Sequence, residues 1–157
     1  MRIIRKIIFL LFVVLIIMQF FPPAENKSDT TPPTDLILAT SPPKEVEAII
    51  TNACYDCHSN NTRYPWYANI EPVSYWMAAH IEEGREHLDF SQWELYANKK
   101  KAHKLDEMIE AVTEGWMPLK SYTWIHNDAK LTDEQAKTIA EWAKMLKLTY
   151  ETTDQPQ

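Results

Sequence analysis

Two cysteines and one histidine fall within a single five-residue stretch, Cys54-Tyr55-Asp56-Cys57-His58. Their spacing, C-x-x-C-H, is typical of the covalent attachment of a c-type haem. Two thiols three positions apart can reach the two vinyl groups of one porphyrin, and the adjacent histidine can then bind the iron. The chain has no other cysteine. The motif therefore predicts one haem c, joined to Cys54 and Cys57 and ligated by His58.

The same residues leave two other interpretations open. A thiol or disulfide role would suit a thioredoxin-like pair, but such a pair belongs near a βαβ pattern, which the sequence does not show. A zinc site could combine Cys54 and Cys57 with two of the five histidines. The usual second pair of closely spaced ligands is missing, however. Haem is the interpretation that the motif favours.

Met117 is the first candidate for a second axial ligand, which a haem iron with one histidine commonly has when it transfers electrons. It lies in the segment Gly115-Trp116-Met117-Pro118-Leu119, where Pro118 restrains it to an extended conformation. His80, on the apolar stripe of a predicted helix, is the alternative. An open sixth position also remains possible, and the less favoured protein ligands are Met77, His87, His103 and His126.

The two propionates of a haem need hydrogen-bond donors, which an indole N–H or a guanidinium can supply. Trp66 and Arg85 are the first candidates for these donors, and Arg63 and Tyr64 are further ones. Trp66 lies in the segment Arg63-Tyr64-Pro65-Trp66-Tyr67. So much aromatic surface on an irregular segment favours a large partner that covers it.

The elements that must position these residues are predicted to be helices. A helix should run from Pro42 to about Cys54, with Ser41 as its N-cap. A second should open at Pro72 and end between Gly84 and Leu88, and a third should run from a capping box at Ser91-x-x-Glu94 to Gly115. Another capping box, Thr132-x-x-Gln135, starts the last helix. No alternating strand pattern of useful length occurs, so the sequence predicts an all-α domain over residues 44–150, followed by a flexible tail at 151–157.

The N-terminus has a different composition. Ile7–Phe21 is apolar except for Gln19, and it follows the basic residues Arg2, Arg5 and Lys6. Counted from residue 3, this run approaches the roughly 20 residues that cross a bilayer. We therefore expect residues 1–21 to be a signal-anchor that crosses the inner membrane through residues 3–21; a cleaved signal peptide is the alternative. Either way the domain lies on the exported, periplasmic or extracytoplasmic, side. Residues 22–43 contain three Pro-Pro pairs and are predicted to be a linker.

The charge and glycine content exclude other classes of function. The chain has 22 acidic and 16 basic residues, and three of the basic ones precede residue 7. So acidic a domain is unsuited to nucleic acid, which proteins bind by neutralising phosphates. Only two glycines occur, which argues against a glycine-rich phosphate-binding loop.

Several longer stretches resemble one family. They are Cys57-His58-Ser59-Asn60-Asn61-Thr62, Tyr64-Pro65-Trp66-Tyr67, Pro72-Val73-Ser74, His80-Ile81-x-x-Gly84-Arg85, Phe90-Ser91-x-Trp93 and Met117-Pro118-Leu119. Together they resemble the haem-binding domain family, over nearly all of residues 45–147. The order of C-x-x-C-H, Met-Pro and a final helix also resembles a class I cytochrome c. The resemblance implies an exported, cytochrome c-like helical domain that carries haem covalently.

Two functions fit such a domain. The first is a carrier that passes single electrons between redox partner proteins, and for it no catalytic acid or base is needed. The second is a haem-based sensor or peroxidase-like site with a displaceable sixth ligand, in which His80 or His126 acts on the distal side. The sequence favours the electron carrier over an enzyme.

Overall fold

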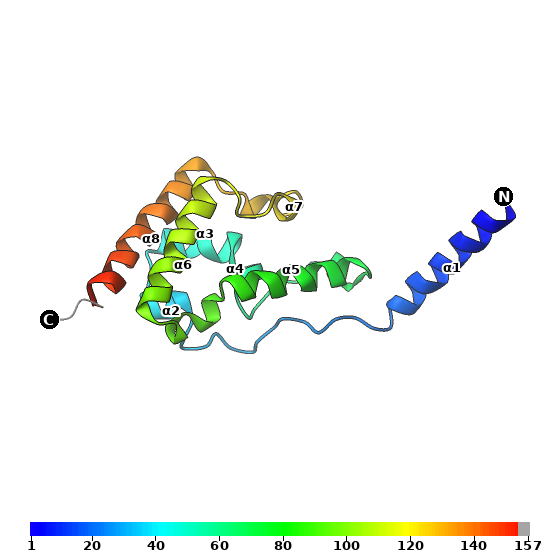
Figure 1. Cartoon of the computed structure of the whole chain (residues 1–157), viewed down its shortest axis with the longest axis horizontal. Coiled ribbons are helices and arrows are strands. Elements are labelled where there is room, and N and C mark those ends of the chain that lie inside the picture. Colours follow the sequence, from blue (N-terminus) through cyan, green and yellow to red (C-terminus); the bar gives the residue numbers. More distant parts are fainter. Residues whose placement is uncertain (154–157) are drawn as a thin grey trace.

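The computed structural model describes residues 1–153. Within this range every regular element is a helix, as predicted (Figure 1). The α-helices are α1 (Arg2–Met18), α2 (Leu36–Thr40), α3 (Lys44–Ala53), α4 (Tyr55–His58), α5 (Val73–His87), α6 (Asn98–Thr113), α7 (Lys120–Thr123) and α8 (Asp133–Thr153). Three 3-10 helices complete the set: η1 (Trp66–Asn69), η2 (Phe90–Leu95) and η3 (Asn127–Ala129). The all-α prediction is confirmed for the described residues.

The hydrophobic core lies where α3 meets the antiparallel pair α6 and α8, which lie side by side in Figure 1. Leu105 of α6 and Ile139 of α8 are completely or almost completely buried there, at positions set by the helical period of their apolar residues. The 3-10 helix η2 adds Phe90 and Trp93, each only 1% exposed. The indole N–H of Trp93 donates to the Tyr150 hydroxyl at 3.0 Å, so the end of α8 is tied to the core.

The capping box of the last helix is confirmed. The Thr132 hydroxyl accepts from the backbone N–H of Gln135 at 3.1 Å, and the Gln135 side chain accepts from the N–H of Thr132 at 3.0 Å. The helix α8 continues to Thr153, so the first three residues of the predicted tail at 151–157 are helical. Residues 154–157 lie outside the described residues.

The other prediction, a capping box at Ser91-x-x-Glu94, is wrong. Asp89 is the cap of this segment, because its carboxylate accepts from the N–H of Ser91 at 2.9 Å. The Ser91 hydroxyl instead bonds with Asn60, across the chain. Residues 90–95 form the 3-10 helix η2, and α6 begins only at Asn98. A long-range partner has therefore overridden a local signal.

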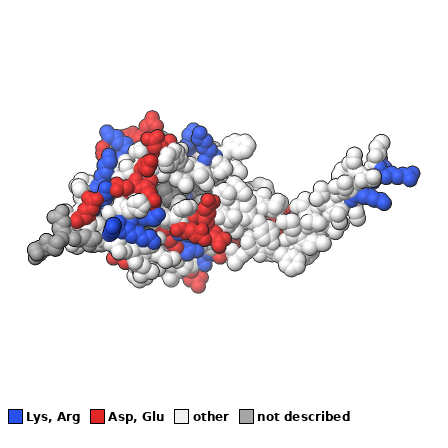
Figure 2. All heavy atoms as spheres, viewed as in Figure 1, with Lys and Arg blue, Asp and Glu red and all other residues white. Residues whose placement is uncertain are grey.

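The helix α1 extends away from the domain and buries none of its residues (Figure 1). It covers 17 residues, and no helix in residues 1–153 is both long enough and apolar enough to span a membrane. The predicted spanning segment at residues 3–21 is therefore not supported. Only the end of this segment contacts the domain, where the Gln19 side chain bonds with the backbone N–H and carbonyl of Glu71. Figure 2 shows basic residues at the N-terminal end of α1 and charges of both signs over the domain, with mostly uncharged surface between them on the face in view.

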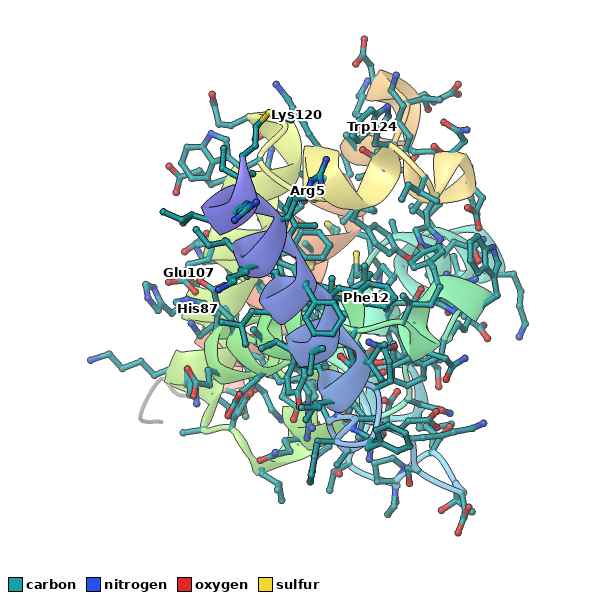
Figure 3. The ribbon with its side chains drawn as sticks, turned by 90° about the vertical axis from the view of Figure 1, so that its right-hand side faces the viewer. Arg5, Phe12, His87, Glu107, Lys120 and Trp124 are labelled. Atoms are coloured by element: carbon teal, nitrogen blue, oxygen red, sulfur yellow. The ribbon has the colours of Figure 1, made fainter. Side chains whose placement is uncertain are left out.

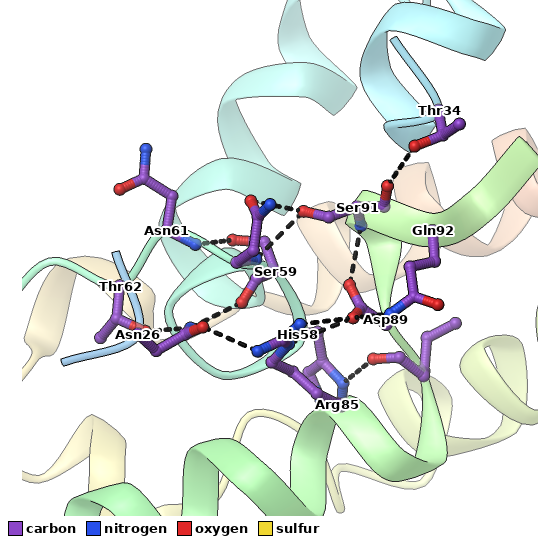
Figure 4. A network of polar contacts seen from close by, with 12 residues as sticks. Asn26, Thr34, His58, Ser59, Asn61, Thr62, Arg85, Asp89, Ser91 and Gln92 are labelled. Carbon is purple, nitrogen blue, oxygen red and sulfur yellow. Dashed lines mark hydrogen bonds and ion pairs between the residues drawn. The ribbon is translucent and has the colours of Figure 1, made fainter. Parts of the chain in front are cut away.

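Much of the segment predicted to be a linker is packed against the domain. The Asn26 side chain donates to the Ser59 carbonyl at 2.8 Å and to the Thr62 hydroxyl at 2.9 Å (Figure 4). Farther along, the Thr34 hydroxyl donates to the Ser91 carbonyl at 2.6 Å. We call residues 26–41 the N-terminal strap, because Asn26 holds the loop after the C-x-x-C-H motif and Thr34 holds η2. These residues of the predicted linker 22–43 thus contact the domain.

The strap ends in α2, where Leu36 is fully buried. Asp35 caps α2 by accepting from the N–H of Ile37 at 3.0 Å. Ser41 has a φ of 46° and ends this short helix, while α3 starts at Lys44. The prediction that Ser41 caps the helix at 42–54 is therefore wrong, although the extent of that helix is nearly correct.

The buried carboxyl of Asp35 should make stability depend on pH. Burial raises its pKa, although the Tyr55 hydroxyl donates to Oδ1 at 2.7 Å. Its other oxygen, Oδ2, has no hydrogen-bond partner among residues 1–153. A raised carboxyl pKa favours folding below the unfolded-state pKa of about 4, and this contribution is lost as the pH rises through the folded-state pKa.

We therefore expect Asp35→Asn to raise the free energy of unfolding at pH 7 and to have a smaller effect at pH 4. Urea unfolding at both values measures the difference. Asp128→Asn, at an exposed aspartate, is the control and should show no such pH-dependent gain. A constant difference between parent and Asp35→Asn from pH 4 to pH 7 would contradict the assignment.

Candidate functional site

The C-x-x-C-H motif forms a kinked helical turn. The helix α3 ends at Ala53, and Cys54 leaves the helical region with φ −124° before the single turn α4. The Cys54 carbonyl accepts from the N–H groups of Cys57 at 3.2 Å and His58 at 3.0 Å. This turn brings both thiols and the imidazole to the same side, where all three line one cavity.

Two adjoining cavities lie beside this turn, and their volumes are about 150 and about 360 Å³. Cys54, His58 and Met117 line both of them, and Cys57 lines the larger. We call them the motif cavities. Their walls are mostly apolar, which is typical of sites for small molecules and cofactors. The fold therefore brings Met117, from the loop between α6 and α7, to the same space as the C-x-x-C-H motif.

The His58 imidazole is oriented by one hydrogen bond. Its Nδ1 lies 2.9 Å from the Leu88 carbonyl, to which it must donate, so Nε2 keeps its lone pair. Burial lowers the pKa of His58, so the imidazole stays neutral. A neutral ring held through Nδ1 is the form that binds a metal through Nε2.

The two thiols are protonated before any attachment. Burial raises the pKa of Cys54 to about 12 and that of Cys57 to about 11. A reactive redox pair needs lowered thiol pKa values, so a thioredoxin-like role does not fit. Among residues 1–153, no group of three or more His, Cys, Asp or Glu side chains is placed to hold a metal ion. The zinc interpretation therefore has no set of ligands in the described part of the chain.

Gly84 lets α5 lie directly against the motif. A Cβ atom at this position would lie 2.7 Å from the Cys57 carbonyl oxygen and 3.2 Å from the Cys57 Cβ. Real Cβ atoms do not approach backbone atoms so closely, so only glycine fits here. The position of α5 in turn supplies Leu88, whose carbonyl orients His58.

A family model described as a haem-binding domain matches residues 13–145. The chain belongs to this family. No curated protein and no solved structure matches the chain. The match includes the whole of the site built above, from the C-x-x-C-H turn to Met117. The protein is a haem-binding domain, and its own residues fit that cofactor: a mostly apolar space beside two cysteines and a neutral, oriented imidazole.

Two histidines of α5, His80 and His87, lie at the motif cavities. His80 lines the larger motif cavity, and its Nδ1 lies 2.9 Å from the Trp76 carbonyl. His87 lines both motif cavities, although the sequence places it among the less favoured iron ligands. His103 lies outside them, exposed and 3.2 Å from Glu107. His126 and Met77 line a neighbouring cavity.

The predicted propionate donors do not line the motif cavities. Arg85 donates to Asp89 at 3.0 and 3.1 Å and to Asn26 at 2.8 Å (Figure 4), so it ties α5 to the strap. Trp66 lines the neighbouring cavity and is 78% exposed. Arg63 pairs with Asp56 at 3.1 Å. The side chain that sequence reasoning missed is Lys104, a cation of α6 that lines the smaller motif cavity.

Proposed function

We propose that this haem-binding domain carries one haem c, joined by thioethers to Cys54 and Cys57, and that it transfers single electrons. His58 and Met117 would hold its iron. The observation that carries the proposal is the meeting of Cys54, His58 and Met117 around the motif cavities. When bound, haem iron supplies one-electron redox chemistry.

The chain's own residues supply three further conditions for electron transfer. Leu88 fixes the tautomer of His58. The apolar walls, including Phe90 and Val112, limit the access of water. A histidine and a thioether as the two ligands favour a high reduction potential. The acidic composition of the chain favours a redox partner with a basic surface.

Export is part of the same proposal. The basic residues at the N-terminus and the apolar helix α1 have the composition of a signal segment. We propose that residues 1–21 direct export and that the haem-binding domain functions on the exported side. Covalent attachment would keep the cofactor with the protein in that compartment.

A haem-based sensor or peroxidase-like function is the second candidate. It is favoured by the exposure of Met117, which is 36%, because an exposed thioether can be displaced more easily than a buried one. His80 and His87 line the same space and could then act as acid–base groups.

Replacing Met117 by alanine separates the two candidates. We expect the purified, haem-loaded parent to give a low-spin spectrum, and Met117→Ala to convert most of the haem to the high-spin form at pH 7. Visible absorption spectra of both proteins measure this change. Met145→Ala is the matched control, because Met145 is 67% exposed on α8 and does not line the motif cavities.

An unchanged low-spin spectrum in Met117→Ala would refute Met117 as the ligand. His80→Ala and His87→Ala then identify the group that is bound. A high-spin spectrum already present in the parent would favour the sensor or peroxidase-like function instead.

A further inference from the structure

A third cavity, of about 370 Å³, lies next to the motif cavities. It shares Cys57, His80, Leu119 and Tyr122 with the larger of them. We call it the aromatic cavity, because aromatic rings and aliphatic side chains form most of its wall. Besides the shared residues, these are Trp66, Tyr67, Val73, Trp76, Met77 and Ile125.

A hydrogen-bonded pair of rings, Tyr67 and His126, lies in this mostly apolar wall, whose other polar side chains include His80, Thr62, Ser121 and the paired Asp56 and Arg63. The Tyr67 hydroxyl is 2.6 Å from Nε2 of His126, and the His126 ring stacks on Tyr122 with centroids 4.4 Å apart and planes at 15°. If Nε2 accepts from Tyr67, the phenol oxygen can still accept a hydrogen bond from a ligand. If Nε2–H donates to Tyr67, the phenol hydrogen can be donated to a ligand. The pair can therefore form a hydrogen bond with either a carbonyl group or a hydroxyl group of a ligand.

Among the described wall residues, the Arg63 and Asp56 side chains are paired with each other, with 3.1 Å between the guanidinium and the carboxylate. A carboxylate ligand would find no unpaired cation in this wall, so the cavity suits an uncharged molecule. Stacked and edge-on rings favour a flat one, since Trp66 meets Tyr67 at 81° and Tyr122 lies parallel to His126.

The surroundings of the cavity suit a ligand that arrives from an apolar phase. Three of its wall residues are exposed: Trp66 by 78%, Ile125 by 62% and Trp76 by 49%. Trp124, which is 85% exposed, lies on the face toward which α1 projects (Figure 3). Exposed apolar area of this extent marks an interaction site on a protein surface.

We infer that the aromatic cavity binds the ring of a lipid-soluble quinone. The ring is flat and uncharged, and it carries carbonyl oxygens when oxidised and hydroxyl groups when reduced. The Tyr67–His126 pair matches both forms. Binding itself does not depend on haem. Only the use of the quinone as a redox partner beside Cys57 rests on the proposed function.

Menadione is a suitable probe, in equilibrium dialysis against the full, haem-loaded chain in detergent micelles. We expect saturable binding of one menadione per chain. Tyr67→Phe should weaken the affinity about fivefold, the usual value of one hydrogen bond. Val73→Trp, which fills the cavity, should abolish binding. Tyr75→Phe is the matched control, because it removes a phenol hydroxyl outside the cavity and should leave the affinity unchanged.

Three outcomes would overturn the inference. One is the absence of saturable binding, and another is an equal effect of Tyr67→Phe and Tyr75→Phe. The third is a loss of haem or a shifted haem spectrum in Tyr67→Phe, which would assign the cavity to haem itself. Competition by dodecanoate would instead indicate a site for acyl chains and would equally refute a quinone site. Haem content is measured separately on each sample. A chain that carries no haem but still binds menadione would refute the proposed function and leave the quinone site standing.

Discussion

The double variant Cys54→Ser, Cys57→Ser should retain no haem on a denaturing gel, whereas the parent should retain one haem per chain. Both thioether bonds are absent in this variant, and denaturant breaks the remaining iron–ligand bonds. Each single variant should keep a reduced amount, held by one thioether. A haem stain and the mass of the intact chain measure the difference, after expression in a cell with a haem-attachment system.

The same double variant should also unfold at a lower temperature. Cofactor binding to the folded chain stabilises it by mass action, and this contribution falls when the cofactor can dissociate. Thr51→Ala, on an exposed position of α3, is the control and should keep both the haem and the stability. Equal stain in the parent and the double variant would refute covalent attachment through these cysteines.

Gly84→Ala should have the second largest effect. The added Cβ would lie 2.7 Å from the Cys57 carbonyl oxygen, and this neighbour is backbone that cannot rotate away. Either α5 or the C-x-x-C-H turn must shift. We expect a destabilisation of about 2 kcal/mol, within the range for overpacking at a close contact. Haem incorporation should fall as well, because a shift of α5 also moves the Leu88 carbonyl that orients His58.

The other glycine of the chain provides a matched control. Gly115 has φ +70°, but a Cβ there would meet nothing within 4 Å. Gly115→Ala should therefore cost only about 1 kcal/mol of backbone strain. Urea unfolding and the haem-to-protein ratio measure both variants. If Gly84→Ala keeps full haem incorporation and loses no more stability than Gly115→Ala, the close approach of α5 is not required.

Local signals predicted the parts of the fold that depend on neighbours in sequence. The capping box of Thr132 and Gln135 needs only three residues and a following apolar stripe, and it formed as expected. The apolar period also gave the extent of α3 and α5 to within a few residues. The C-x-x-C-H motif is equally local, which is why it could be found without a structure.

Long-range partners were not predictable in this way. Asn26 lies in a proline-rich stretch whose composition indicates a linker, yet it bonds with Ser59, Thr62 and Arg85. Arg85 was expected at haem propionates because a guanidinium suits a carboxylate, but its nearest carboxylate is Asp89, one helical turn away. The spacing of Arg85 and Asp89, four residues apart, is compatible with an ion pair. It gives no sign that Arg85 also donates to Asn26.

The N-terminal strap has a consequence for the order of assembly. Its contacts hold the loop that follows the cysteines, whereas both thiols are partly exposed and line the motif cavities, whose described walls contain no residue of 26–41. An attaching enzyme must reach those sulfur atoms. The docked strap leaves the side of the motif cavities open, so covalent attachment does not require residues 26–41 to be displaced.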